Sequence, residues 1–269
     1  MSTMALPTPG LAGLGVRLVA NETVKELQLA WRRQALLATF VVMQGITFLG
    51  IRLLIGGGHI VTPLLAATLP ALLAYTVAQI AAQQGSGGIA EEINAGTLAQ
   101  SQLTPASAQR QVFGRLAALA VAGLAAAIPL GLGFTLGYGV HYHLSPDVLL
   151  PAALTVADGL GYALLIIALT VRVASIGAIT HVFGMVIQFF AGVLVPVWVF
   201  PHAMQIALRF LPTALGVQAL NTTLAGHGLS ACWADGTLPW LIVHAAASLA
   251  LGWVIYVRNI RRARREGGL

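Results

Sequence analysis

The stretch from Ile60 to Ala82 reads IVTPLLAATLPALLAYTVAQIAA and contains no Asp, Glu, Lys or Arg. Because an α-helix rises about 1.5 Å per residue, this stretch would be about 34 Å long and could cross the roughly 30 Å hydrocarbon core of a bilayer. Pro70 does not argue against a helix, since neighbouring helices in a membrane can satisfy the backbone group that a proline frees. The stretch therefore predicts a transmembrane helix.

The composition of the whole chain agrees with a membrane location. Of its 269 residues, 58% are hydrophobic and 8% are charged, whereas a soluble domain carries about 25% charged residues. The single cysteine, Cys232, excludes a disulfide framework within the chain. We therefore predict an all-α integral membrane protein with six transmembrane helices. The apolar runs are Gln34–Ile55, Ile60–Ala82, Leu116–Tyr138, Val148–Val171, Ile176–Phe200 and Leu238–Val257.

The basic residues predict the orientation. With the N-terminus inside, 12 of the 14 Lys and Arg lie in cytoplasmic segments, and Arg52 and Arg209 fall outside. This distribution follows the positive-inside rule, so we expect both termini in the cytoplasm of a multi-pass protein of the cell membrane. The net charge of +6 then reports topology rather than a nucleic-acid partner. Membrane lipid is the expected neighbour of the basic tail, 258–269.

The segment before the first span, 1–33, is predicted to be a cytoplasmic leader that ends in an amphipathic helix. From Val16 to Arg33, apolar and charged residues lie on opposite helical faces, which is typical of a helix in the membrane interface. A soluble leader helix is the alternative. The residues expected at the interface are Lys25, Trp31, Arg32 and Arg33.

Residues 34–257 are predicted to form a single transmembrane domain, in which 83–115 is a cytoplasmic loop. Pro105 would end a helix near Thr104, so we expect a short loop helix from Glu91 to Thr104 that lies parallel to the membrane. Its acids would stand at its N-terminal end, where the helix dipole favours them. Such a helix is either a docking surface for a partner or an ordinary loop helix.

The outer segment 201–237 holds apolar pieces that are too short to span. Pro201 would end the fifth span, and Pro212 separates His202–Leu211 from Thr213–Leu224. We expect helices that re-enter the outer leaflet. The alternative is one proline-broken seventh span, which would place the basic tail outside, against the positive-inside rule.

The cytoplasmic loop resembles that of the type-2 ABC-transporter permeases, which carry an acidic-x-x-x-Gly-Thr-Leu stretch followed by Leu-x-Thr-Pro-x-Ser. The outer prolines and Ala219-Leu220 are also similar to that family, although Asn221 stands where a basic residue is frequent. Asn94, Ala99 and Ser101 depart from the family pattern in the loop. The matching loop residues are Glu92, Gly96, Thr97, Leu98, Leu103, Thr104, Pro105 and Ser107.

The resemblance implies a permease subunit of an ATP-driven exporter that moves an amphiphilic substrate outward. A P-loop needs a lysine within Gly-x-x-x-x-Gly-Lys-Ser/Thr, and Lys25, the only lysine, lies in another context. The implied partners are two copies of a separate ATPase, which would bind ATP and magnesium, and a second permease that is either identical or similar. We expect no cofactor, metal or catalytic residue in this chain. The expected path lies at the dimer interface, near spans one, two and five. The residues implied in ATPase coupling are Glu91, Glu92, Gly96, Thr97, Leu98, Leu103, Thr104 and Pro105.

Two ionisable residues inside spans are candidates for a substrate path. Asp158 stands in the fourth span, where a charge costs about 2.5–3.5 kcal/mol to insert, and a structural bond to Thr155 or Tyr162 is the alternative. Arg52 lies near the outer end of the first span and is expected to extend to the head groups. If Asp158 carried ions, the chain would be a secondary transporter. A membrane scaffold without transport is a further alternative.

Histidines offer weaker signals. His141 and His143 with Asp147 provide metal-ligand types in an outer loop, but a fixed fourth ligand is lacking and we expect no metal site. His181 and His244 lie near span ends without an evident partner, so we expect them to be packed or interfacial.

Overall fold

The computed structural model describes residues 11–32, 34–97, 108–173 and 176–265. Within these ranges the chain is helical and contains no strand. The helices are α1 (Leu11–Arg32), α2 (Gln34–Ile55), α3 (Thr62–Asn94), α5 (Ala108–Tyr138), η1 (Pro146–Val148), α6 (Leu149–Thr170), α7 (Gly177–Phe190), η2 (Val197–Val199), α8 (His202–Leu208), α9 (Ala214–Leu224), α10 (Gly228–Ala234) and α11 (Thr237–Arg265).

Five segments in the described part of the chain are long and apolar enough to cross a membrane: α2, α3, α5, η1 with α6, and α11. The turn between α2 and α3 depends on Gly57 and Gly58, whose φ values of +62° and +91° are strained for other residues. Pro63 then occupies the first turn of α3, where its missing N–H is not needed. The chain is thus a multi-pass membrane protein.

The prediction of one continuous fifth span from Ile176 to Phe200 was wrong. Helix α7 has 14 residues and ends at Phe190, so it is about 21 Å long and too short to cross the hydrocarbon alone. Gly192 then turns the chain with a φ of +96°, and a single 3-10 turn follows at η2. Hydropathy did not reveal this end because the residues on both sides of it are apolar. A sixth crossing stays a prediction.

The loop that was predicted to be cytoplasmic is shorter than the range 83–115, because α3 continues to Asn94. Gly85 allows this continuation to pack closely, since a Cβ there would lie 2.4 Å from the side chain of Ile167. Ile89 is fully buried one turn later. As a result Glu91 and Glu92 lie in the last turn of α3 and not, as predicted, at the N-terminal end of a loop helix.

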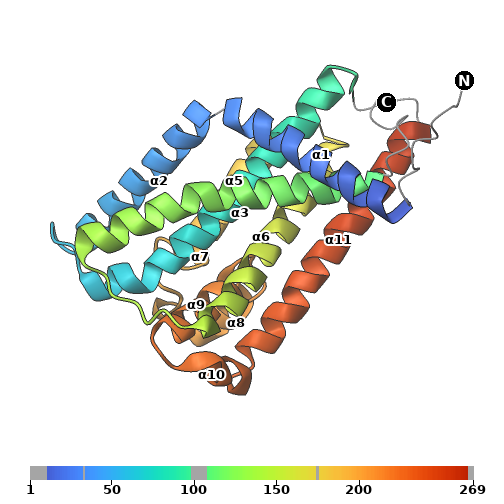
Figure 1. Ribbon diagram of the computed structural model, residues 1–269. Helices are drawn as coiled ribbons and strands as arrows, with labels where there is room; N and C mark the ends of the chain where they lie inside the picture. Colours follow the sequence, from blue (N-terminus) through green and yellow to red (C-terminus); the bar gives the residue numbers. More distant parts are fainter. Residues whose placement is uncertain (1–10, 33, 98–107, 174–175, 266–269) are drawn as a thin grey trace, which may run out of the picture.

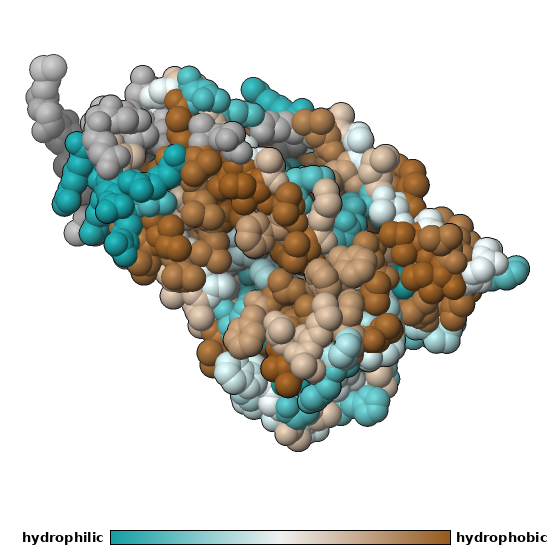
Figure 2. Space-filling view, turned by 180° about the vertical axis from the view of Figure 1, so that it is seen from behind, coloured by the Kyte–Doolittle hydropathy of each residue, from teal (hydrophilic) through white to brown (hydrophobic). Residues whose placement is uncertain are grey.

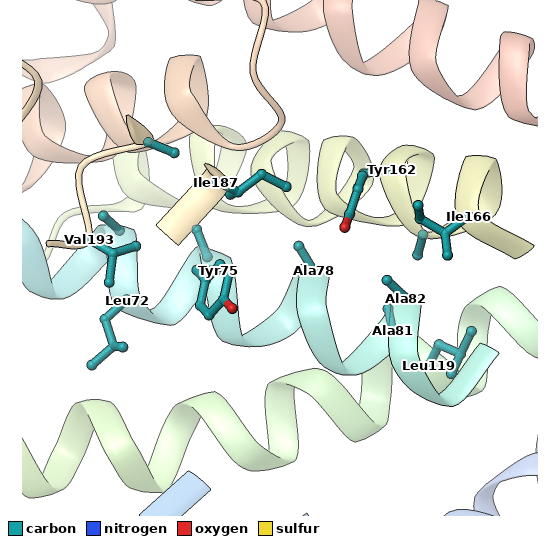
Figure 3. Packing of buried hydrophobic residues seen from close by; sticks show 14 of the residues in the cluster. Leu72, Tyr75, Ala78, Ala81, Ala82, Leu119, Tyr162, Ile166, Ile187 and Val193 are labelled. Atoms are coloured by element: carbon teal, nitrogen blue, oxygen red, sulfur yellow. The ribbon is translucent and has the colours of Figure 1, made fainter. Parts of the chain in front are cut away.

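Helix α3 is the centre of the bundle. In its apolar window 72% of residues are buried, against 17% in α2 and 22% in α11. Figure 3 shows Tyr75 and Ala78 of α3 facing Tyr162 and Ile166 of α6. At Gly159 of α6 a Cβ would lie 3.0 Å from that of Ala78, so small residues permit the close approach of these helices. The low burial of α2 and α11 leaves long apolar faces for lipid or a partner.

Helix α1 and the short helices α8, α9 and α10 lie at opposite ends of the bundle (Figure 1). In Figure 1, α1 crosses one end of the bundle near the end of α11, and α8, α9 and α10 cluster at the other end. A broad apolar surface lies between hydrophilic ends in Figure 2. The predicted outer pieces are helical over α8 and α9, and α9 packs against α3, α6 and α11. Their entry into the outer leaflet stays a prediction.

Candidate functional site

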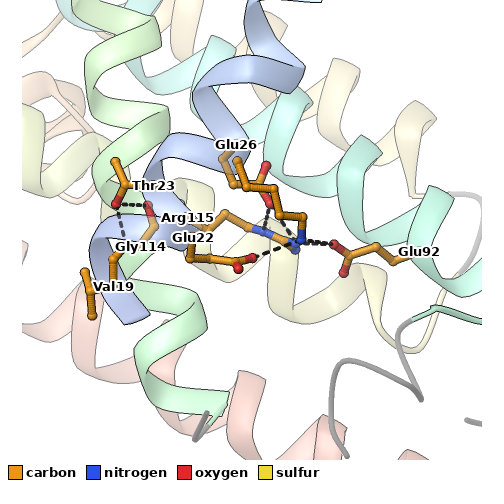
Figure 4. Close-up of polar contacts among 8 residues, drawn as sticks. Val19, Glu22, Thr23, Glu26, Glu92, Gly114 and Arg115 are labelled. Atoms are coloured by element: carbon orange, nitrogen blue, oxygen red, sulfur yellow. Dashed lines mark hydrogen bonds and ion pairs between the residues drawn. The ribbon is translucent and has the colours of Figure 1, made fainter. Parts of the chain in front are cut away.

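The side chain of Arg115 is buried where three helices meet. Its Nε donates to Oε1 of Glu26 on α1 at 3.0 Å, and its Nη2 donates to Oε1 of Glu92 at the end of α3. The Arg115 side chain is 9% exposed, and the two carboxylate side chains are 15% and 20% exposed. Figure 4 shows the guanidinium between the two carboxylates. One cation on α5 therefore links α1 to α3.

A second cation completes this group. Lys25 Nζ lies 3.2 Å from Oε1 of Glu22 and 3.9 Å from Oε1 of Glu92, and its side chain is 51% exposed. Exposed pairs of this kind contribute only about 0–1 kcal/mol, so Arg115 dominates the energetics. A negative charge at the C-terminal end of α3 opposes the helix dipole, and the two cations offset this cost. We call Glu22, Lys25, Glu26, Glu92 and Arg115 the Arg115 cluster.

Helix α1 lies directly on the first turns of α5. The Thr23 hydroxyl is 3.1 Å from the carbonyl of Gly114 and 2.9 Å from that of Val19, both acceptors. A Cβ at Gly114 would lie 2.7 Å from the Cβ of Glu22, so only glycine allows this approach. The predicted amphipathic helix therefore packs on the bundle with its polar side. Trp31, near the end of the same helix, is 73% exposed.

Next to the cluster lies a cavity of about 400 Å³. It is bounded by α1, the end of α3 and the start of α5, and its lining mixes charged and apolar side chains. The polar lining residues are Lys25, Glu26, Gln84, Glu91, Glu92 and Thr97. The cavity has no catalytic arrangement of a nucleophile with a base, and we assign it no ligand.

The structure describes part of the predicted coupling sequence. Glu91, Gly96 and Thr97 are exposed, and the φ of +67° at Gly96 turns the chain out of α3. The Thr97 hydroxyl donates to the carbonyl of Glu92 at 3.3 Å. The remaining predicted coupling residues and one predicted interfacial residue lie outside the described residues; these are Leu98, Leu103, Thr104, Pro105 and Arg33.

Sequence reasoning counted Arg115 only as one of the inner basic residues. Its carboxylate partners are 89 and 23 positions away in the chain, and no local pattern connects residues at those separations. The available signal was the position of a single arginine just inside an apolar run. Such a charge needs a partner or access to water.

Arg52 was predicted to extend to the head groups, and this prediction was wrong. Its side chain is buried in the protein, with 1% of the residue exposed. Its Nη2 donates to the carbonyls of Val193 and Leu194, which follow the end of α7. The guanidinium carbon also lies 5.0 Å from the centre of the Phe48 ring. The correction has a physical reason: the broken α7 leaves carbonyls without helical partners, and an arginine can donate to several of them at once.

Asp158 is fully buried and has the hydrogen-bonded structural role that was the alternative, but its partners are not Thr155 or Tyr162, the two residues that the sequence suggested. The Thr155 hydroxyl donates instead to the carbonyl of Pro151. Asp158 Oδ1 lies 2.7 Å from Nδ1 of His244 on α11, and Asp158 Oδ2 accepts the backbone N–H of Thr213 at 2.8 Å. Sequence reasoning left His244 without a partner because 86 positions separate the two residues.

The loop with His141, His143 and Asp147, which was predicted to lie outside, makes hydrogen bonds that hold the structure together. The backbone N–H of His143 donates to the carbonyl of Leu224, and Asp147 Oδ2 accepts the N–H of Leu229 at 3.3 Å. In the described part of the chain, no group of three or more His, Cys, Asp or Glu is arranged to hold a metal ion.

Comparison of the sequence with known protein families shows the family of this chain. The family model described as ABC-2 type transporter matches residues 20–224, which run from α1 to the end of α9. The chain belongs to this family. It is an ABC transporter permease subunit, a membrane component of transport that is not itself a catalytic enzyme. A search of curated proteins found no match.

Most of the residues described above lie inside the matched range. It includes the Arg115 cluster and Asp158, whereas His244 lies on α11, beyond its end. In the permease Pro201 caps the N-terminus of α8. Pro212 precedes Thr213, which stands before α9 with a φ of +69°. ABC-2 permeases normally work with an ABC ATPase.

Proposed function

We propose that the permease forms the membrane half of an ATP-driven exporter and that a separate ATPase docks at the exposed end of α3. The observation that carries this proposal is the Arg115 cluster. It connects Glu92, in the family-like motif, to both α1 and α5. Glu91, Gly96 and Thr97 form the neighbouring exposed surface, on which a partner would press.

The cluster suits the transmission of force. Removing one partner of a buried ion pair costs about 3–5 kcal/mol, several times the thermal energy. A displacement at the end of α3 would therefore move α1 and α5 with it before the pair separated. The close contact at Gly114 adds a steric reason for α1 and α5 to move as one body.

We place the transport path where α2, α3 and α7 adjoin, between two permease copies. Helix α2 is poorly buried, and α7 exposes Val182, Phe183 and Met185, so both offer apolar surface to a second copy. Between them, Gln188 Nε2 donates to Oε1 of Gln44 at 3.3 Å. An apolar face that also carries amides fits an amphiphilic substrate such as a drug, an antibiotic, a lipid or a lipid-linked glycan.

The proposed orientation puts α1, the Arg115 cluster and the basic end of α11 in the cytoplasm of a cell with the permease in its cell membrane. The inner placement of 12 of the 14 basic residues supports it through the positive-inside rule. Export is then directed toward the end that carries α8, α9 and α10. ATP and magnesium would bind to two ATPase subunits, with a homodimer of the permease between them.

Reconstitution tests this function. The permease in proteoliposomes should show neither ATP hydrolysis nor export alone, and both should appear on assembly with its ATPase. The control is the same ATPase with its P-loop lysine replaced, which should bind without driving export. ATP hydrolysis by the pure permease, or ATPase that never associates with it, would refute the proposal.

A further inference from the structure

Asp158 and His244 hold a loop at the outer end of the bundle from both sides. Asp158 Oδ2 accepts the N–H of Thr213, and His244 Nε2 lies 3.1 Å from the carbonyl oxygen of Phe210. The two loop residues flank Leu211 and Pro212, which connect α8 to α9. We call Asp158, His244, Phe210 and Thr213 the outer latch.

The hydrogen bonds of the outer latch require one extra proton. A backbone carbonyl and an ionised carboxylate can only accept, whereas a neutral imidazole has one N–H. Nε2 of His244 must donate to Phe210, so the contact between Nδ1 and Asp158 Oδ1 needs a further proton on one of these two atoms. The pair is then neutral as a unit, either as imidazolium with carboxylate or as imidazole with carboxylic acid.

Burial makes that proton important. The Asp158 side chain is 0% exposed and that of His244 is 20% exposed, so a pair without the proton would leave an uncompensated anion buried in the protein. Among the described residues, the one other side chain that donates to Asp158 is the Ser248 hydroxyl, at 3.4 Å. Loss of the proton would also break the bond to Asp158 or the bond to Phe210.

The other ionisable groups on the surrounding helices make no hydrogen bond or ion pair with Asp158 or His244 among the described contacts. They are Tyr162 on α6, Tyr75 on α3, His202 and Arg209 at α8, Cys232 on α10 and Asp235 before α11. Among the described residues, the hydrogen bonds and ion pairs of Asp158 and His244 go to one another, to Phe210, Thr213 and Ser248.

We propose that Asp158 and His244 form a proton-binding site that latches the α8–α9 loop to α6 and α11. The loop contributes Arg209 to the lining of a cavity of about 260 Å³, which Leu208 of α8 and Ala214 of α9 line on either side of the loop. Proton loss as the pH rises weakens the latch, and the loop becomes free to move. This site regulates the outer end of the permease and does not depend on the ATPase.

The latch can be tested by measuring the rate of thiol labelling of the full-length permease in lipid nanodiscs, in which the reagent reaches both faces of the bilayer. The reporter is Leu211→Cys, a partly buried position, in a chain with Cys232→Ala. A cysteine at the exposed Gly57 corrects for titration of the thiol itself. We expect the corrected rate at Leu211→Cys to rise from about pH 6 to about pH 9, the side on which a histidine proton is lost.

Two substitutions should abolish that pH dependence. Asp158→Asn and His244→Phe should each label about tenfold or more faster at neutral pH, as expected for the loss of a hydrogen bond to a charged group, with a flat pH profile. His181→Phe, the same change at an exposed position of α7, should behave like the parent chain. A parent rate that is independent of pH would overturn the proton site without any substitution in it. Equal rates in the parent, Asp158→Asn and His244→Phe would overturn the latch.

Discussion

Replacing Arg115 with methionine removes the cation of the Arg115 cluster and keeps a long apolar side chain. Glu26 and Glu92 would then face each other at 15% and 20% exposure, without the donor that they share. Lys25 compensates poorly, because its ammonium lies 3.9 Å from Glu92 and its side chain is half exposed.

The magnitude follows from the burial. Breaking a fully buried pair costs about 3–5 kcal/mol, and the partial exposure of both carboxylates reduces this, so we expect a loss of about 2–4 kcal/mol in stability. Glu92→Gln in the same chain should restore part of the loss, because it removes the repulsion. A double-mutant cycle over the two positions should give a coupling of about 1–3 kcal/mol.

Denaturation of the permease in defined micelles measures the stability, and reconstituted export per ATP hydrolysed measures the coupling. Arg261→Met is the matched control, since it removes an equal charge at an exposed position of α11 and should stay within about 0.5 kcal/mol of the parent. We expect Arg115→Met to bind the ATPase yet export less per ATP. If Arg115→Met matched Arg261→Met in both measurements, the role of the cluster in transmission would be wrong.

Further predictions concern glycines and topology. Gly96→Pro should uncouple export from ATP hydrolysis with normal membrane insertion, because proline fixes φ near about −65° and Gly96 stands at +67°; Gly88→Ala, in open space, is the control. Gly184→Leu should destabilise the permease by about 1–3 kcal/mol in thermal denaturation, since even a Cβ would lie 2.6 Å from Gln79, whereas Gly177→Ala should be neutral. With Cys232 replaced, cysteines at Gly57 and Gly228 should react with an impermeant reagent from outside the cell; reaction at Gly228 only after permeabilisation would contradict the proposed outer placement.

The sequence was most informative where one helix could be judged alone. All but the first two residues of the uncharged run Ile60–Ala82 lie in α3, and the described part of the predicted interfacial helix, Val16 to Arg32, lies in α1. Prediction failed at Gln83–Ala90, where polar and glycine residues indicated a loop but contacts with other helices keep α3 intact. It also failed at Phe190, where a uniformly apolar run conceals the end of α7.

Site residues whose partners are distant in sequence were beyond local reasoning. Glu92 was predicted from its motif, but its contact with Arg115 depends on how α3 and α5 pack. Asp158 was singled out as a buried charge, and its partner on α11 emerged only from the fold. A buried charge in a span thus indicates that a partner exists, because an unpaired charge there is too costly. Only the packing of the helices shows which residue that partner is.

The two ends of the permease are connected through the attachments of α9. Asn221 Nδ2 donates to the carbonyl of Ala67 on α3 at 2.9 Å, whereas Thr213 is held by Asp158 on α6. Helix α3 runs without interruption from Ala67 to Glu92, a distance of about 38 Å at helical rise. A movement of α3 relative to α6, driven at the Arg115 cluster, would therefore act on α9 at Asn221 while the outer latch holds its other end. Whether α9 tilts or stays depends on the latch, so a proton on Asp158 and His244 and a push on Glu92 would act on the same short helix from opposite ends of the bundle.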